Sequence, residues 1–332
     1  MSRFTVLVTD FAWPSLEIER QILARVDAEL LIADGEGPDE LTRFAPQADA
    51  ILTNWRQIPP EVLDAAPRCL VISRFGIGVD NIPVERATEL GILVTNVPSF
   101  CVDEVSDHAL ALLLACARRI APLADSVRRH VWSLEPARGI RRVRGQTLGI
   151  VGFGAIARAL APKAAALGLE LLAYTPRLDS ASLPTGVTKA STLEELLTAS
   201  DFVTLHAPAT SETRRLIGEP ELRLMKPTAY LVNTSRGMLV DEAALARAVT
   251  EGWIAGAALD VLTVEPPADD NPLLGVDGVL VTPHSAFYSE DAVAELEARA
   301  ASNVATVLSG RLPNAIVNPA VLNRRALRFR AA

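Results

Sequence analysis

Three side chains able to move a proton or stabilise charge stand at or just beyond predicted strand ends in the second half of the sequence. They are Arg236 in "NTSRG", Glu265 in "TVEPP" and His284 in "TPHSA". Together they offer a cation for a carboxylate and a carbonyl, an imidazole for a proton, and a carboxylate that favours the imidazolium. Reduction of a 2-oxo acid requires such a set. Taken singly, each has a simpler explanation, because a loop histidine is often solvated and an Arg–Glu pair is often a surface ion pair.

A glycine-rich loop precedes these residues. In "GIVGFGAIARAL" a predicted strand ends at Val151, and Gly152, Gly154 and Ala157 occupy the G-x-G-x-x-G/A positions before a predicted helix. The first glycine allows a tight turn, the second lets the backbone approach a pyrophosphate, and the small third residue lets helix and strand pack. The N–H groups from Phe153 through Ala155 to Ile156 and the helix dipole would face the anion. The pattern predicts a dinucleotide site, with a plain glycine-rich turn as the alternative.

The next strand, in "LLAYTPRLD" at residues 171–179, lacks the carboxylate that usually follows it. Such an acid, about 20 positions after the glycine motif, binds the adenosine ribose and repels a 2′-phosphate. Thr175 stands there, 175 − 152 = 23 positions past Gly152, followed by Pro176 and Arg177. Arg177 could pair with a phosphate, or Asp179 could neutralise it. We therefore expect NADP or NAD as cofactor, with NADP slightly favoured.

The elements that must position these residues form two series. Short apolar runs alternate with helical patterns from "TVLVTD" to "CLVISRFG", and a second series runs from Thr147 to "GVLVTPHSA". This alternation indicates βαβ units on parallel sheets. We predict an α/β protein with two doubly wound domains, the Rossmann cofactor domain inserted in a discontinuous flavodoxin-like substrate domain. The expected bounds are 1–99 plus 290–332 for the substrate domain and 100–289 for the NAD(P)-binding domain, with "CVDEVSDHALALLLACARRI" as a long helix opening the second.

Composition narrows the function classes. Net charge −8 and pI near 5.2 give no overall positive field for phosphate backbones, so a nucleic-acid partner is not expected. The longest apolar run, "ALALLLACA" at 109–117, is shorter than a membrane span, and no membrane partner or secretory signal is expected. Cys69, Cys101 and Cys116 match neither a metal site nor a disulfide framework and are interpreted as buried free thiols. We expect a cytoplasmic protein without a metal.

Several motifs together resemble one family. "RFGIGVDNI", "VGFGAIA", "NTSRGMLVDEAAL", "AALDVLTVEPP" and "TPHSA" are similar, in order and spacing, to the D-2-hydroxyacid dehydrogenases over residues 5–318. "CVDEVSDHALALLL" and "PHSAFYSED" resemble the branch that contains the C-terminal binding proteins, which are corepressors. The resemblance implies an NAD(P)-dependent oxidoreductase that interconverts a small 2-oxo acid and its (R)-2-hydroxy acid.

The resemblance also implies roles for individual residues. His284 would be the acid and base, Glu265 would orient and charge it, and Arg236 would bind the substrate carboxylate and polarise its carbonyl. Ile77, Gly78 and Val79 would hold the carboxylate through backbone N–H groups. Arg74 would reach the substrate, although a solvated or ion-paired Arg74 is an open alternative. The expected cofactor contacts beyond the glycine loop and Thr175 to Arg177 are His206, Ala207, Pro208, Thr213, Thr234, Ser235, Arg236, Asp260, His284 and Ala286.

Asp260 would accept a hydrogen bond from the nicotinamide amide, or it would cap the next turn. Phe287 stands where the corepressor branch has Trp, so it is in doubt whether this protein shares the substrate preference of that branch. The candidates to line the pocket for the substrate's side chain, or else to be ordinary core residues, are Trp55, Phe75, Phe100 and Phe287. His108 is expected to be packed or hydrogen-bonded and His130 to be solvated.

Two other functions compete with the leading hypothesis. A nucleotide-sensing corepressor-like interaction protein would bind a partner without turnover. A formate or phosphite dehydrogenase would share the fold, but Glu265 argues against the formate enzymes. The family also implies a homodimer, for which the apolar face of residues 109–117 is compatible, although burial in the core would give the same pattern.

Overall fold

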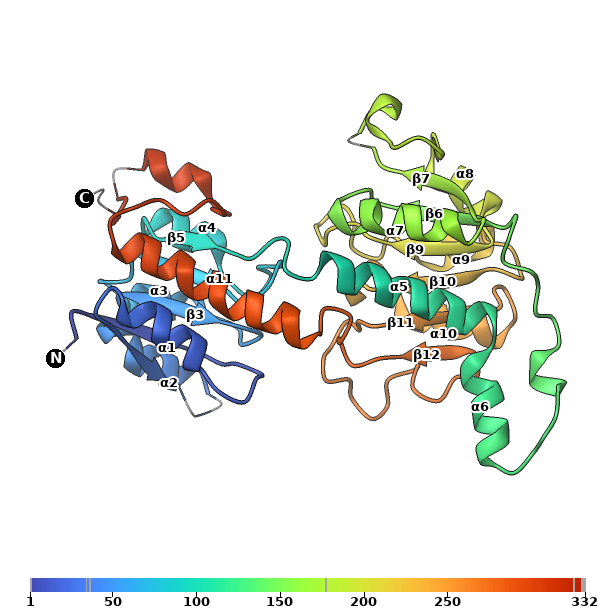
Figure 1. Cartoon of the computed structure of the whole chain (residues 1–332), viewed down its shortest axis with the longest axis horizontal. Coiled ribbons are helices and arrows are strands. Elements are labelled where there is room, and N and C mark those ends of the chain that lie inside the picture. Colours follow the sequence, from blue (N-terminus) through green and yellow to red (C-terminus); the bar gives the residue numbers. More distant parts are fainter. Residues whose placement is uncertain (1, 34, 36, 177, 325, 330–332) are drawn as a thin grey trace. The chain divides into compact units, whose positions relative to one another are not determined.

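Strands and helices alternate along the chain of the computed structural model, which describes residues 2–33, 35, 37–176, 178–324 and 326–329 (Figure 1). The chain divides into unit 1, residues 1–100 with 289–332, and unit 2, residues 101–288. These boundaries lie one residue from the expected ones. None of the helices in the described ranges combines the length and the apolar character needed to cross a membrane.

Unit 1 contains a five-stranded parallel sheet of order β2-β1-β3-β4-β5, the flavodoxin-like order. Helices α1 and α11 pack together and contact one face, whereas α2, α3 and α4 pack over the other face around Leu7, Ile51 and Ile72. The strands are β1 (Phe4–Val8), β2 (Ala28–Ile32), β3 (Ala50–Thr53), β4 (Val71–Arg74) and β5 (Leu93–Thr95), and the helices are α1 (Glu17–Ala24), α2 (Pro38–Phe44), α3 (Pro60–Asp64), α4 (Val84–Glu89) and α11 (Glu290–Leu308).

The C-terminal segment packs on the rest of unit 1. The Val317 N–H donates to the Val94 carbonyl at 2.8 Å, and the Asn318 side chain accepts from the Val94 N–H and donates to the Ile92 carbonyl. These bonds satisfy the outer edge of β5 and explain how a segment more than 200 residues away in sequence completes the same unit.

Unit 2 contains a seven-stranded parallel sheet of order β12-β11-β10-β9-β6-β7-β8. Helices α5 and α7 cover one face, and α8, α9 and α10 cover the other, so the sheet is doubly wound as predicted. The strands are β6 (Thr147–Val151), β7 (Glu170–Tyr174), β8 (Val187–Lys189), β9 (Phe202–Leu205), β10 (Tyr230–Asn233), β11 (Gly256–Leu259) and β12 (Val279–Val281), and the helices are α5 (Val102–Ala117), α6 (Ile120–Arg128), α7 (Ala155–Ala166), α8 (Leu193–Ala199), α9 (Glu219–Leu224) and α10 (Glu242–Thr250).

The long helix expected to open unit 2 is α5, and it ends earlier than expected. α5 ends at Ala117, Arg119 adopts φ +50°, and α6 then begins at Ile120. A left-handed residue cannot continue a right-handed helix, so the chain changes direction there. The apolar face of residues 109–117 is buried in the core of unit 2, through Ala109, Leu112, Leu113, Cys116 and Ala117. Core burial therefore accounts for that face.

Candidate active site

His284 and Glu265 form a close acid–base pair in unit 2. Nδ1 of His284 lies 2.6 Å from Oε2 of Glu265, and the other carboxylate oxygen accepts the N–H of Leu262 at 2.8 Å. The bond at Nδ1 leaves Nε2 as the imidazole nitrogen that can face a reacting group. About a third of each side chain is exposed, 31% for His284 and 36% for Glu265, so this pair is open to a ligand within unit 2.

The charge of Glu265 follows from its surroundings. Partial burial raises the pKa of its carboxyl, but the hydrogen bond and charge of His284, the Leu262 N–H and the charge of Arg236 together outweigh burial. The net pKa of Glu265 is therefore lowered, and the group is a carboxylate at neutral pH. The influence of Arg236 on this pKa shows that the fold brings all three predicted catalytic side chains into one region.

A buried carboxylate fixes the turn that carries His284. Asp260, which directly follows β11, is 1% exposed; its Oδ1 accepts the Ser285 N–H at 2.9 Å and its Oδ2 accepts the Ala286 N–H at 2.8 Å. The His284 N–H donates to the Asp260 carbonyl at 2.8 Å. His284 has φ +49°, a conformation that most residues avoid, and these bonds hold it there. Asp260 was predicted to cap the turn that follows it, but its carboxylate instead holds this later turn, and its bond to the nicotinamide amide stays a prediction.

Arg236 follows β10 and is partly exposed. Its Nη1 donates to the Ser235 carbonyl at 2.7 Å, and its own carbonyl accepts from the side chain of Asn233, a fully buried residue at the end of the strand. Gly237 comes next, and a Cβ there would lie 1.9 Å from the carbonyl carbon of Leu262, the residue that binds Glu265. Only glycine therefore lets the Arg236 segment approach the Glu265 segment this closely.

The glycine loop lies between β6 and α7, as predicted. Gly152 has φ +87°, and a Cβ there would lie 2.8 Å from backbone atoms of His206 and Ala207. At Gly154 an added Cβ would meet nothing within 4 Å, so the loop is open on that side. Among the described residues, none accepts a hydrogen bond from the N–H groups of residues 153–156. Unused N–H groups at a helix N-terminus are what a pyrophosphate would bind, and this geometry fits a dinucleotide.

The other expected cofactor contacts lie after β9 and β10, at the same sheet edge. The hydroxyl of Thr234 is buried and has no hydrogen-bond partner in the described part of the chain, which a bound polar ligand would explain. The Ser235 hydroxyl, in contrast, donates to the Ala207 carbonyl at 2.7 Å, and Thr213 donates to the Pro208 carbonyl at 2.7 Å. Burial lowers the pKa of His206 to about 4, so its imidazole is neutral and can bond to Thr204.

The stretch that was predicted to select the cofactor begins where β7 ends. Thr175 is 6% exposed and Pro176 is exposed, whereas Arg177 lies outside the described residues, so its predicted pairing with a phosphate has no structural counterpart here. A different arginine, which the sequence argument missed, stands nearby. Arg158 of α7 stacks over the Phe153 ring, 5.3 Å from its centroid, and both terminal nitrogens donate to the Ser182 carbonyl at 3.3 Å. Its guanidinium therefore links the glycine loop to the segment after β7.

The predicted residues of unit 1 lie where β4 ends. Arg74 is neither fully solvated nor confined to an ion pair, since its Nη1 donates to the Asn54 side chain at 3.1 Å. The Ile77 carbonyl accepts from the Asn96 side chain at 2.7 Å, which fixes the loop. Over the ranges that the structure describes, no hydrogen bond uses the N–H groups of Ile77, Gly78 or Val79. Three adjacent donors without an internal acceptor fit the predicted binding of a carboxylate.

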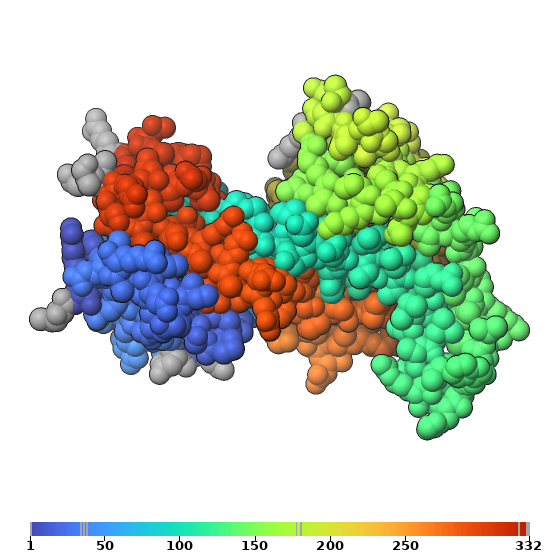
Figure 2. All heavy atoms as spheres, viewed as in Figure 1, coloured from blue at the N-terminus to red at the C-terminus, as the bar shows by residue number. Residues whose placement is uncertain are grey.

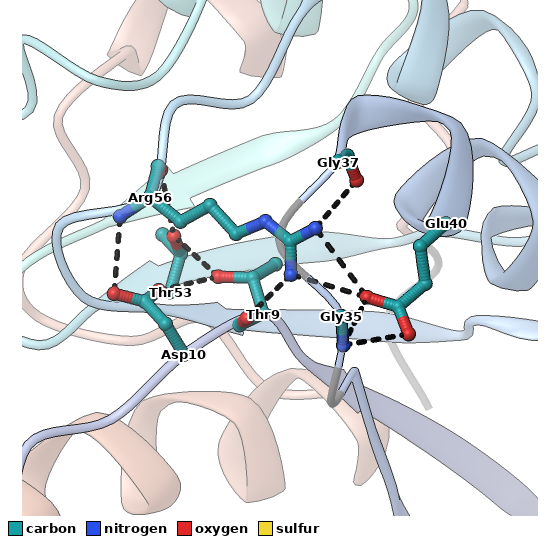
Figure 3. A network of polar contacts seen from close by, with 7 residues as sticks. All are labelled: Thr9, Asp10, Gly35, Gly37, Glu40, Thr53 and Arg56. Atoms are coloured by element: carbon teal, nitrogen blue, oxygen red, sulfur yellow. Dashed lines mark hydrogen bonds and ion pairs between the residues drawn. The ribbon is translucent and has the colours of Figure 1, made fainter.

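A polar network that sequence reasoning missed joins the ends of β1 and β3 (Figure 3). Asp10, two residues after the end of β1, accepts the N–H groups of Trp55 and Arg56. Arg56 in turn binds Glu40 and the carbonyls of Thr9 and Gly37. The network borders a pocket of about 390 Å³, lined by Thr9, Asp10, Phe11, Ala33, Gly35 and Arg56. The sequence pattern that could have identified this network was present, because Asp10 and Asn54 each follow the end of a strand, as Arg236 does.

The remaining candidates divide between core and surface. Phe75 and Phe100 are buried in unit 1, whereas Trp55 is 50% exposed and Phe287 lies edge-on to His284 with ring centroids 6.3 Å apart. The three cysteines are free and buried, and burial raises the pKa of Cys69 and of Cys116 to about 12. His108 bonds to Thr282 and His130 is exposed, as expected. No group of three or more metal-binding side chains occurs among the described residues.

Comparison with known proteins identifies the family to which the chain belongs. The family model of the D-isomer specific 2-hydroxyacid dehydrogenase NAD binding domain matches residues 110–286, more than half of the 332 residues. The chain belongs to the D-isomer specific 2-hydroxyacid dehydrogenase family. A glyoxylate reductase from Korarchaeum cryptofilum is 42% identical over 272 residues, which are 81% of this chain and 82% of that enzyme.

Two further members of the 2-hydroxyacid dehydrogenase family extend the likeness. A D-3-phosphoglycerate dehydrogenase from Methanocaldococcus jannaschii is 38% identical over 94% of this chain, which spans only 59% of that longer protein. The crystal structure of an NADPH-dependent glyoxylate/hydroxypyruvate reductase from Sinorhizobium meliloti, in complex with NADP and malonate, superposes with a TM-score of 0.85 at 28% identity, covering 100% of this chain and 99% of that one.

These comparisons confirm the predicted family, the fold class and the enzyme class, an NAD(P)-dependent 2-hydroxyacid dehydrogenase. They do not specify the corepressor branch, so the narrower resemblance stays a prediction. The roles of single residues and the choice between NAD and NADP likewise stay predictions.

Proposed function

We propose that this enzyme interconverts a small 2-oxo acid and its (R)-2-hydroxy acid. The observation that carries the proposal is the pair of His284 and Glu265, 2.6 Å apart, in the same region as Arg236. When bound, the nicotinamide dinucleotide donates a hydride in the reduction and accepts it in the oxidation. The glycine loop and the unpartnered Thr234 hydroxyl support binding of this cofactor by unit 2.

In the proposed reduction, the proton comes from Nε2 of His284. Glu265 accepts the hydrogen bond of Nδ1 and stabilises the imidazolium by its charge. Arg236 binds the substrate carboxylate and stabilises the negative charge that develops on the carbonyl oxygen as the hydride arrives. The N–H groups of residues 77–79 and the guanidinium of Arg74 hold the carboxylate from unit 1. In the oxidation, His284 takes the hydroxyl proton back through the same nitrogen.

The proposal includes use of NADP(H), slightly favoured over NAD(H). Thr175 places no carboxylate at the end of β7, so nothing at that position repels a 2′-phosphate. Arg158 adds a positive charge between the glycine loop and the segment after β7, where the ribose of a bound dinucleotide would lie. Arg177 remains a second candidate for the same phosphate.

We further propose that the enzyme is a cytoplasmic homodimer. The three buried free cysteines suit a reducing compartment. Exposed apolar side chains gather on α6 and the segment after it, with Trp132 at 92% exposure and Leu134 at 82%. Figures 1 and 2 show this segment, in green, extending beyond the sheet of unit 2. An apolar surface of this kind is commonly covered by a partner subunit.

The function can be tested by a screen with both nucleotides. We expect oxidation of NADPH, and more weakly of NADH, with at least one 2-oxo acid from a set with short, branched, hydroxylated and aromatic side chains. His284→Gln should lower kcat/KM by about 10²- to 10⁴-fold, because it removes the proton donor.

His130→Gln, which changes an exposed histidine of the same unit, is the matched control and should keep wild-type activity. If the folded protein binds nucleotide and yet none of the acids is turned over above background, the proposed function is wrong. A specific protein partner whose binding is strengthened by dinucleotide and unaffected by His284→Ala would then favour the corepressor-like alternative.

A further inference from the structure

The guanidinium of Arg74 occupies a defined place in unit 1. Its Nη1 lies 3.1 Å from Oδ1 of Asn54, on the neighbouring strand end. On its other side the group lies against Gly76, where an added Cβ would be 2.5 Å from Nη1. The amide of Asn54 is a neutral acceptor, so this contact orients the guanidinium without cancelling its charge.

Asn54 is itself held by the backbone of its own turn. It is 4% exposed; its N–H donates to Oδ1 of Asp10 at 2.9 Å, and its carbonyl accepts from Nδ2 of Asn81 at 3.0 Å. Oδ2 of Asp10 accepts the next two N–H groups of the turn, from Trp55 at 2.7 Å and Arg56 at 3.0 Å. A carboxylate that accepts three consecutive N–H groups holds the turn rigidly.

A second arginine at this sheet edge serves a different purpose. The terminal nitrogens of Arg56 donate to the carbonyls of Thr9 and Gly37, at 3.1 Å and 2.6 Å, and both lie 3.4 Å from Glu40 (Figure 3). Its side chain is 14% exposed, and its charge is balanced inside the network. Arg56 therefore joins loops of unit 1, and it provides a matched comparison for Arg74.

We propose that Asn54 is a positioning residue for Arg74, and that Asp10 holds Asn54 in place, so that unit 1 presents a fixed guanidinium to the substrate carboxylate. This inference rests on the proposed function of Arg74. An arginine side chain loses much rotational freedom when it binds an anion, and a prior hydrogen bond to Asn54 reduces that loss. Without it, the ground-state complex and the transition state should weaken together, which raises KM more than it lowers kcat.

The test is a double-mutant cycle on steady-state kinetics with the best 2-oxo acid. Asn54→Ala should raise KM about 10-fold with a smaller change in kcat, since a modest misplacement of a binding group has effects of this order or larger. Arg74→Gln should raise KM at least as much. The double variant Asn54→Ala with Arg74→Gln should have almost the same KM as Arg74→Gln alone, because Asn54 acts through Arg74. Arg56→Gln should lower Tm and leave KM unchanged.

Malonate titrated into the NADP-bound protein gives a readout that needs no turnover. Its Kd should rise with Asn54→Ala in the wild-type background and stay constant in the Arg74→Gln background. An equal rise in both backgrounds, or a lower Tm with neither KM nor Kd altered, would show that Asn54 has a structural role only. If Arg74→Gln changes neither KM nor Kd, Arg74 does not bind the substrate carboxylate and the inference about Asn54 is wrong too. If no 2-oxo acid is turned over but the malonate Kd still depends on Asn54 only when Arg74 is present, the proposed function alone is wrong.

Discussion

At the scale of single residues, the acid–base chemistry proposed for unit 2 depends on groups that fix the backbone at His284. His284 adopts a left-handed conformation that costs about 1 kcal/mol or more for a residue other than glycine. Asp260 offsets this cost by accepting the N–H groups of Ser285 and Ala286. The imidazole thus projects from a turn that is set before any ligand binds. Glu265 completes the arrangement by determining which imidazole nitrogen is turned away from it.

Cofactor choice is a prediction at this scale. Thr175→Asp should move the ratio of kcat/KM values for NADPH and NADH toward NADH, because the new carboxylate binds the ribose hydroxyls and repels a 2′-phosphate. Arg158→Gln should lower kcat/KM for NADPH by about 10-fold and change that for NADH little, as expected for loss of one charge-assisted hydrogen bond. Parallel initial-rate measurements with the two reduced nucleotides give both ratios.

Arg223→Gln is the control for Arg158→Gln. Arg223 stacks on Trp253, 3.6 Å from the ring centroid, much as Arg158 stacks on Phe153, but it belongs to α9 and is bound to Glu219. Its removal should leave the nucleotide ratio unchanged. An unaltered ratio in Thr175→Asp would count against the explanation offered for the cofactor.

Residues of the site were predictable where a polar side chain stands within three residues of the end of a strand. Arg236 and His284 were found in this way, and Asp10 and Asn54 satisfy the same criterion but were not considered. Arg158 could not be found, because it stands inside a helix and only the fold brings its guanidinium to the Ser182 carbonyl. Asp260 was predicted to cap the next turn or to bind the nicotinamide amide, and only the fold shows that its carboxylate holds the distant turn at 282–286.

At the scale of elements, α1 and α11 of unit 1 meet through two carboxyl groups. Glu19 is fully buried and Glu297 is 6% exposed, and their charges act on each other across the helix contact. Burial, with the charge of Glu19, raises the pKa of Glu297 to about 7, and burial also raises the pKa of Glu19 despite the nearby Trp13 and Arg20. As pH rises past the pKa of Glu297, the charge of this pair therefore opposes the packing of the two helices.

The stability of unit 1 should depend on pH accordingly. In the unfolded chain Glu297 ionises near 4.5, and in the folded chain near 7, so the folded state holds a proton over that interval and stability falls as pH rises through it. Glu297→Gln removes the charge. We expect it to raise Tm by about 2 to 5 °C at pH 8 and to have little effect at pH 4.5.

Differential scanning calorimetry across this pH range measures the effect of Glu297→Gln. Glu295→Gln, on the same helix but paired with Arg299 at the surface, should give no gain that grows with pH. A gain from Glu297→Gln that is the same at every pH would show that packing, and not the proton, is responsible.

Most elements were predictable from the sequence because apolar runs and helical patterns alternate clearly in both units. The alternation of apolar and polar residues does not show where a single residue adopts a left-handed conformation. The break at Arg119 between α5 and α6 was therefore missed. An apolar face also does not indicate what it packs against. Residues 109–117 could have contacted a second subunit, but they pack against α7 and the sheet of unit 2.

At the scale of the whole molecule, the apolar surface that remains uncovered lies elsewhere. Ile120, Val127 and Val131 are at least half exposed, and Trp132 and Leu134 are almost completely exposed. Isolated apolar side chains at a surface are ordinary, whereas five exposed apolar side chains within 15 residues favour burial of this surface against a partner. In the sequence, the apolar face of residues 109–117 was compatible with a dimer contact, and burial in the core was left open because both give the same pattern.

Disruption of this surface should separate the subunits. The wild-type protein should sediment as a dimer at micromolar concentration, and the variant Trp132→Lys with Leu134→Lys should sediment as a monomer, because two buried charges without partners would have to be desolvated in the contact. Trp55→Lys changes a half-exposed tryptophan in unit 1 and should leave the dimer intact. A wild-type protein that is monomeric at this concentration would exclude the dimer. A double variant that still dimerises would show that the subunits meet through a different surface.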